Sequence, residues 1–106
     1  MSGEQPEQTV VDVPERERFE IRRGGETVGF VAYQRAGRLV VLTHTEVDPS
    51  LEGQGVGSVL VRGVLDDLRR EGASVLPLCP FVQAWMGRHH DYHDLDYRRP
   101  RSQVTD

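Results

Sequence analysis

Residues 52–58 run Glu52-Gly53-Gln54-Gly55-Val56-Gly57-Ser58, with glycine at every second position between a β-branched segment and an apolar helical one. Glycine leaves the neighbouring backbone N–H groups unshielded, and a helix that begins here adds its free amides and the positive end of its dipole. A corner of this kind is suited to phosphate. The stretch therefore predicts a phosphorylated small molecule or cofactor that is held mainly by main chain.

The segments around the glycine turn predict the order strand, helix, strand, helix. Residues 39–43 are apolar on both faces, which is typical of a covered strand in the middle of a sheet. Apolar residues then recur at helical spacing at Val56, Val59, Leu60, Val64 and Leu68. Residues 74–78 predict a further strand, and Pro80 opens a second helix over residues 81–88. A right-handed crossover is expected, with strand 74–78 parallel to strand 39–43.

Two further strands precede these elements. Residues 18–23 alternate as a half-buried strand does, and Gly24-Gly25 supplies a tight reversal into a second arm over residues 27–35. Residues 1–15 are polar, acidic and proline-bearing, and they are expected to form a loose tail. A domain over residues 16–97 and a second loose tail over residues 98–106 complete the expected organisation.

Composition limits the partners of the chain. Its 106 residues suffice for one domain, and the formal net charge of -4 argues against a surface that neutralises a nucleic-acid backbone. All 13 basic residues are arginine, so any side-chain contact to phosphate must use a guanidinium group. The sequence shows neither a membrane-spanning run nor a secretion signal, so we expect no membrane partner and a cytoplasmic location. A lone cysteine, Cys79, excludes an internal disulfide.

Four blocks together resemble the small single-domain branch of the GCN5-related N-acetyltransferases, and the resemblance covers residues 19–95. The blocks are His44-Thr45-Glu46-Val47, Gly53-Gln54-Gly55-Val56-Gly57-Ser58, Pro77-Leu78-Cys79-Pro80-Phe81 and Arg88-His89-His90-Asp91-Tyr92. The resemblance implies a mixed α/β (α+β) fold with two main helices and a mostly antiparallel, twisted sheet. That sheet is expected to splay between the third and fourth strands in chain order, which are strand 39–43 and strand 74–78.

The resemblance also implies acetyl-CoA as the co-substrate, with its pantetheine arm in the splay and no metal. The implied cofactor-binding residues are Val47, Gly53, Gln54, Gly55, Val56, Gly57, Ser58, Phe81 and Arg88. An extended diamide needs an exposed strand edge, and a diphosphate needs a helix N-terminus. In this sequence the predicted helix N-terminus follows the predicted strand edge within a few residues. Glu52 departs from the wider superfamily, which usually has Arg or Gln there. The branch that the chain resembles also lacks the N-terminal helices that usually build the acceptor pocket.

Four residues are candidates for the chemistry. His44 and Glu46 lie two apart on a strand, hence on one face, where either could take a proton from an ammonium group. Cys79 precedes a helix, where the dipole favours a thiolate nucleophile, and Tyr92 could protonate the departing thiolate. Each also has a plain structural interpretation, as a cross-strand partner, a turn cap, a space-filling thiol or an aromatic anchor.

A zinc site at His89, His90 and His93 is not expected, because adjacent histidines cannot share a helix face and no second cysteine is available. The sequence thus predicts an N-acyltransferase that moves an acetyl group from acetyl-CoA to a primary amine, directly or through Cys79. A non-catalytic CoA-binding or partner-binding module is the alternative. The acceptor, a small molecule or a protein, stays open, and we expect a monomer or a weak homodimer.

Overall fold

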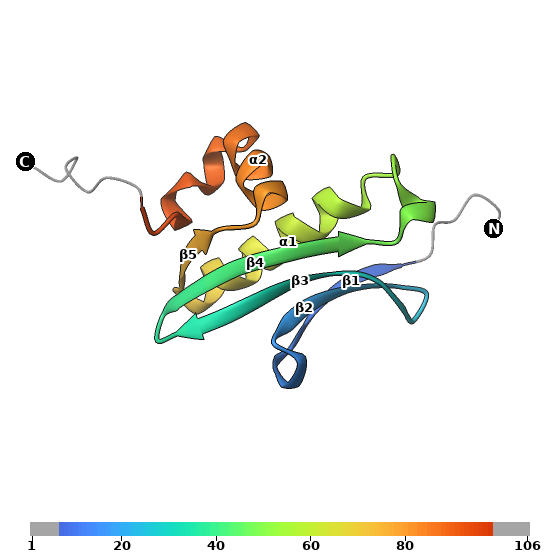
Figure 1. Cartoon of the computed structure of the whole chain (residues 1–106), viewed down its shortest axis with the longest axis horizontal. Helices are drawn as coiled ribbons and strands as arrows, with labels where there is room; N and C mark the ends of the chain where they lie inside the picture. The colour runs from blue at the N-terminus through green and yellow to red at the C-terminus, as the bar shows by residue number, and fades with distance from the viewer. Residues whose placement is uncertain (1–6, 99–106) are drawn as a thin grey trace, which may run out of the picture.

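The computed structural model describes residues 7–98 and contains one five-stranded sheet with the order β1-β2-β3-β4-β5. The strands are β1 (Gln8–Val13), β2 (Arg18–Arg23), β3 (Glu26–Ala36), β4 (Leu39–Val47) and β5 (Ser74–Pro77). The first four pair antiparallel in sequence order, whereas β5 pairs parallel to β4. The predicted mixed fold class and the parallel pairing of the last strand are confirmed (Figure 1).

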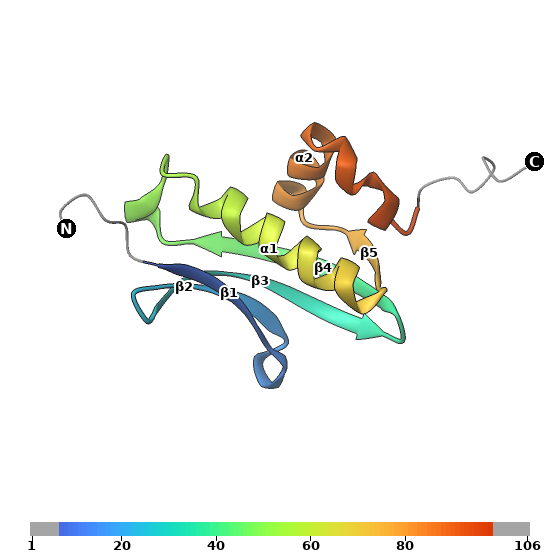
Figure 2. The ribbon, with the colours of Figure 1, turned by 180° about the vertical axis from the view of Figure 1, so that it is seen from behind.

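Two helices carry the other half of the hydrophobic core. They are α1 (Val56–Glu71) and α2 (Pro80–Arg88), and short 3-10 turns lie at η1 (Pro14–Arg16), η2 (Pro49–Leu51) and η3 (His90–Leu95). Figure 2 shows α1 lying across the strands, and its buried residues are Val56, Leu60, Val61, Val64, Leu65 and Leu68. Val59, which the spacing placed on the same face, is 40% exposed. Among the described residues, no helix is long and apolar enough to cross a membrane.

The N-terminal boundary of the domain was predicted wrongly. Residues 8–13 form β1, an ordered edge strand whose Val10 lies opposite Ile21 of β2. On the helix side Val10 packs against Gly63, where a Cβ atom would come within 2.6 Å of the valine. Pairing with β2 and packing on α1 therefore order this segment. The acidic and proline-bearing residues around it had led to the prediction of a loose tail. Residues 1–6 and 99–106 of the two predicted tails lie outside the described part.

A β-bulge in β4 decides which way the end of this strand faces. Tyr33 of β3 lies opposite Leu42, but the preceding Ala32 lies opposite His44, which leaves Thr43 as an extra residue on β4. Val40 and Leu42 point into the core, and an unbroken alternation would send His44 there too. The inserted residue reverses the alternation, so His44 points to the face opposite α1.

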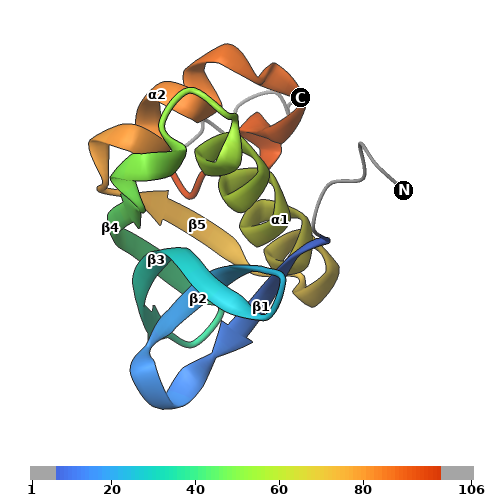
Figure 3. The same cartoon turned by 90° about the vertical axis from the view of Figure 1, so that its right-hand side faces the viewer.

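The splay of the sheet follows from the unequal lengths of the two parallel strands. The last residue of β5, Pro77, lies opposite Leu42, and the next two amides, of Leu78 and Cys79, both donate to the Leu42 carbonyl oxygen at 3.0 Å. Residues 43–47 of β4 run on without a strand beside them on that edge. The chain then turns through η2 and the glycine turn into α1, which Figure 3 shows at an oblique angle.

Candidate functional site

A cavity of about 240 Å³ lies where the free end of β4 meets the first turn of α1. It is lined by Val47, Leu51, Glu52, Phe81 and five residues of the glycine turn, namely Gly53, Gly55, Val56, Gly57 and Ser58. We call it the inner cavity. Most of the predicted cofactor-binding residues therefore come together around one cavity.

The glycine turn presents backbone rather than side chains. Gly53 and Gly55 have φ angles of 85° and 79°, in the left-handed region that favours glycine. Gly55 is the N-cap of α1 and has no side chain to satisfy the first amides, which also lack intrahelical partners. These amides and the positive end of the helix dipole suit an anionic group, as the sequence predicted. Glu52 is exposed and lines the same cavity.

Phe81 forms the wall of the inner cavity that α2 contributes. Its ring lies against Gly57, where a Cβ atom would be 2.7 Å from the ring, so only glycine permits this approach. Ser58, one residue further on, accepts a hydrogen bond from the Trp85 indole N–H at 2.8 Å. The Ser58 side chain thus ties α1 to α2.

Cys79 lies at the inner side of the splay. It is the N-cap of α2, it is 4% exposed, and its sulfur lies 3.2 Å from the Thr45 hydroxyl oxygen. Thr45 pairs with the buried Val31, so this contact is on the helix side of the sheet. Sequence reasoning missed Thr45 as a partner of the thiol, because the contact joins residues 34 positions apart.

His44 and Glu46 lie on the opposite, outer face of β4. They share one face as predicted, and the His44 Nε2–H donates to Glu46 Oε2 at 2.9 Å. Both side chains are more than half exposed. With Nε2 as the donor, Nδ1 of His44 is the nitrogen that can accept a proton, while the carboxylate orients the ring. The structure therefore divides the predicted catalytic residues between the two sides of β4.

Tyr92 and Arg88 lie away from the inner cavity. The Tyr92 hydroxyl donates to Asp66 at 2.7 Å and accepts from Arg62 at 3.2 Å, and its ring packs edge-on against Trp85. Burial and the bond to Asp66 raise the pKa of Tyr92, which makes it a poorer proton donor near neutral pH. The sequence placed this hydroxyl beside the thiolate, but the structure anchors it to α1. Arg88 ends α2, about 10 Å along the helix from Phe81.

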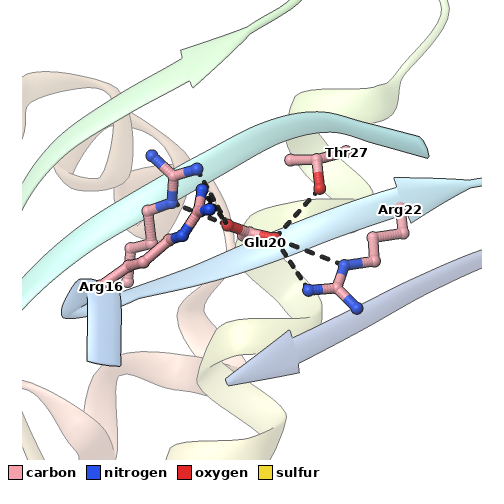
Figure 4. Close-up of polar contacts among 5 residues, drawn as sticks. Arg16, Glu20, Arg22 and Thr27 are labelled. Carbon is pink, nitrogen blue, oxygen red and sulfur yellow. Dashed lines mark hydrogen bonds and ion pairs between the residues drawn. The ribbon is translucent and has the colours of Figure 1, made fainter. Parts of the chain in front are cut away.

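A buried carboxylate on the outer face went unnoticed in the sequence. Glu20 is 3% exposed and accepts hydrogen bonds from Arg18, Arg22 and Thr27 at 2.9 to 3.3 Å (Figure 4). Arg16 lies 3.9 Å away. Burial raises the pKa of Glu20, but the bonds from Arg22, Arg18 and Thr27 outweigh it and lower the pKa from 4.5 to about 2. We call the three arginines around Glu20 the arginine cluster.

A second missed residue reaches the glycine turn from β2. The Arg23 guanidinium donates to the Gln54 side-chain oxygen at 3.2 Å, which brings a cation beside the proposed phosphate-binding amides.

The histidines of the closing block, residues 88–92 and the adjoining His93, have partners other than a metal. His89 stacks on Trp85, and His93 contacts the Met86 carbonyl oxygen at 2.7 Å. Within residues 7–98, no group of three His, Cys, Asp or Glu side chains is placed to hold a metal ion.

Comparison with known proteins agrees with this geometry. A family model described as GCN5-related N-acetyl-transferase matches residues 18–95, and the chain belongs to that family. A search of curated proteins gave no match.

Solved structures share the fold. A GCN5-like protein from Staphylococcus aureus is 20% identical over 100% of both chains, with a TM-score of 0.65. The ribosomal-protein-S18-alanine N-acetyltransferase from Escherichia coli is 24% identical over 57% of this chain and 39% of its own, with a TM-score of 0.53. Ard1 from Thermoplasma volcanium is 25% identical over 57% of this chain and 43% of its own, with a TM-score of 0.50. The chain thus spans less than half the length of the latter two.

Proposed function

We propose that this protein transfers an acetyl group from acetyl-CoA to a primary amine. One observation carries the proposal: the unpaired edge of residues 43–47 leads directly to a helix N-terminus that is capped only by glycine, in a chain of this family. The edge offers backbone groups to the pantetheine amides, and the helix amides offer donors to the diphosphate. The hydrophobic inner cavity between them suits the alkyl parts of the arm.

The chemistry follows from the two faces of β4. Acetyl-CoA supplies the acetyl group as a thioester, whose C–S bond breaks as the amine forms a C–N bond, with CoA leaving as the thiolate. Nδ1 of His44 takes the proton of the attacking amine, and Glu46 stabilises the imidazolium that results. Backbone amides along the unpaired edge of residues 43–47 polarise the carbonyl group.

A route through Cys79 remains the competing form of the same proposal. It requires the acetyl group to be presented to the helix side of β4, where the Thr45 hydroxyl can donate to the thiolate. Direct transfer instead uses the outer face. Parallel double-reciprocal plots together with a trapped acetyl-cysteine would identify the covalent route, and intersecting plots would identify direct transfer.

The proposal is tested by calorimetric titration with CoA and by a thiol-release assay with a panel of amines. A suitable variant is Gly55→Ala, because a non-glycine residue in the left-handed region costs about 1–2 kcal/mol and distorts the cap. Gly87→Ala is the matched control, since this glycine has an ordinary φ and open space around it. We expect weaker CoA binding in the first variant alone. Tight binding without turnover would support a non-catalytic module, and no binding would overturn the proposal.

A further inference from the structure

The outer face of the sheet contains a hollow of about 270 Å³ that is separate from the inner cavity. Residues 27–30 of β3 line one side of it, and residues 46–49 line the other. Val47 lines both this outer hollow and the inner cavity. The His44–Glu46 pair and the arginine cluster lie on the same face, because Arg18 and His44 both lie opposite Ala32, and Glu20 and Glu46 both lie opposite Phe30.

The arginine cluster has more positive charge than Glu20 neutralises. Three guanidinium groups surround a single carboxylate, and the described residues supply no other acidic partner to them. Arg18 contacts Oε2 of Glu20 through Nε and Nη2, both at 2.9 Å. Arg22 contacts Oε1 through Nε at 3.3 Å and through Nη2 at 3.0 Å. The Nη1 groups of Arg18 and Arg22 do not contribute to these contacts with Glu20. The side chains of Arg22 and Arg16 are 40% and 64% exposed.

The cluster is physically linked to the outer hollow. Thr27, which donates to Glu20, lines the hollow, and the Arg18 guanidinium lies 4.3 Å from the centre of the Phe30 ring. The His44 ring, on the neighbouring strand β4, is 6.0 Å from the same ring. The guanidinium and the imidazole are therefore about 10 Å apart at most, two inter-strand spacings, with an aromatic surface between them.

We propose that the arginine cluster is an anion-binding subsite for the acetyl acceptor, which is a primary amine bearing a carboxylate or phosphate. The inference rests on the proposed function, and it names the class of acceptor for the same site. The ammonium end is attracted to Glu46 and loses its proton at His44, while the anionic end pairs with the free N–H groups of the arginines. Allowing for a contact of about 3 Å at each end, the amine and the anion are separated by roughly 4–5 Å.

Binding to the subsite can be measured without any turnover. The Nε–Hε NMR signals of the arginine side chains are followed while sodium acetate or inorganic phosphate replaces chloride at constant ionic strength. We expect selective shifts of the Arg16, Arg18 and Arg22 signals, with the signal of Arg70 on α1 as the control. Uniform shifts, or none in the cluster, would overturn the proposal.

Turnover tests the class of acceptor. We expect kcat/KM for 4-aminobutyrate and for 3-aminopropyl phosphate to exceed that for butylamine by about ten-fold, the effect of a charge-assisted contact. The comparison of the two anionic amines distinguishes carboxylate from phosphate. Arg16→Gln, which removes an exposed guanidinium without breaking the Glu20 hydrogen bonds, should reduce this preference three- to ten-fold and spare butylamine. Arg70→Gln should change neither the preference for the anionic amines nor the kcat/KM for butylamine.

The outcomes separate this inference from the proposed function. Acetylation of butylamine and of the anionic amines at equal rates would overturn the subsite and leave the transferase intact. Selective shifts in the arginine cluster without CoA binding would retain an anion-binding site there but overturn the transferase, and with it the role of this site in holding an acetyl acceptor.

Discussion

The Thr45 hydroxyl oxygen lies 3.2 Å from the Cys79 sulfur and joins β4 to the start of α2 at the point where the two parallel strands separate. A hydroxyl at this distance can donate to a thiolate and stabilise it. We therefore expect the Thr45 hydroxyl to influence how readily Cys79 reacts, whether or not the thiol takes part in acetyl transfer.

Replacing Thr45 by valine keeps the β-branched shape and removes the donor. We expect Thr45→Val to slow alkylation of Cys79 by iodoacetamide about three- to ten-fold, measured by intact mass spectrometry over time. Thr43→Val is the matched control, because the Thr43 hydroxyl contacts the Ala32 carbonyl oxygen instead. Equal alkylation rates in both variants would show that the hydroxyl does not support the thiolate.

The opposite faces of β4 allow a second prediction, which concerns direct transfer. Glu46→Gln removes the charge that stabilises a protonated His44, and we expect kcat to fall by about 10²-fold with little change in CoA affinity. Cys79→Ala should retain most of the activity. The reverse pattern, full activity in Glu46→Gln and none in Cys79→Ala, would instead place the chemistry on the helix side of the sheet.

The sequence predicted the parts of this arrangement that depend on local pattern. The glycine turn, the helix after it and the parallel strand β5 follow from residues that are neighbours along the chain. The bulge at Thr43 could not be predicted, because an extra residue is defined only by pairing with β3. The same holds for Tyr92, whose partner Asp66 lies 26 positions away on α1.

Glu20 makes the free energy of unfolding depend on pH over a defined range. Its pKa is about 2 in the folded chain against 4.5 for the ordinary carboxyl, so between these pH values the unfolded chain binds more protons. The contribution of Glu20 is therefore complete above pH 4.5 and is lost as the pH falls toward 2. At 1.36 kcal/mol per unit, it is at most about 3 kcal/mol before screening by solvent at the partly exposed arginines.

Urea denaturation from pH 7 to pH 2.5 measures this effect. We expect Glu20→Gln to be less stable than the wild type at pH 7 and to lose less stability below pH 4.5. Glu26→Gln, an exposed carboxylate on β3, should keep the wild-type profile. Parallel profiles for Glu20→Gln and the wild type would mean that Glu20 is not held as the anion.

The contact between Gly63 and Val10 tests whether β1 belongs to the domain. A Cβ atom at Gly63 would lie 2.6 Å from a Val10 methyl group and 2.9 Å from its Cβ, and a β-branched side chain has little freedom to move aside. Alanine at this helical position would otherwise be favourable by up to about 1 kcal/mol. We therefore expect Gly63→Ala to lower the free energy of unfolding by about 1–3 kcal/mol, the usual cost of overpacking.

Adding Val10→Ala to Gly63→Ala should recover part of that loss, because the shorter side chain makes room for the new methyl group. The measurement is a double-mutant cycle by urea denaturation, with the coupling energy expected to be favourable by about 1 kcal/mol. If Gly63→Ala is as stable as the wild type, or if the two changes are additive, then β1 does not pack on α1. The same result would mean that pairing with β2, rather than packing on α1, orders residues 8–13.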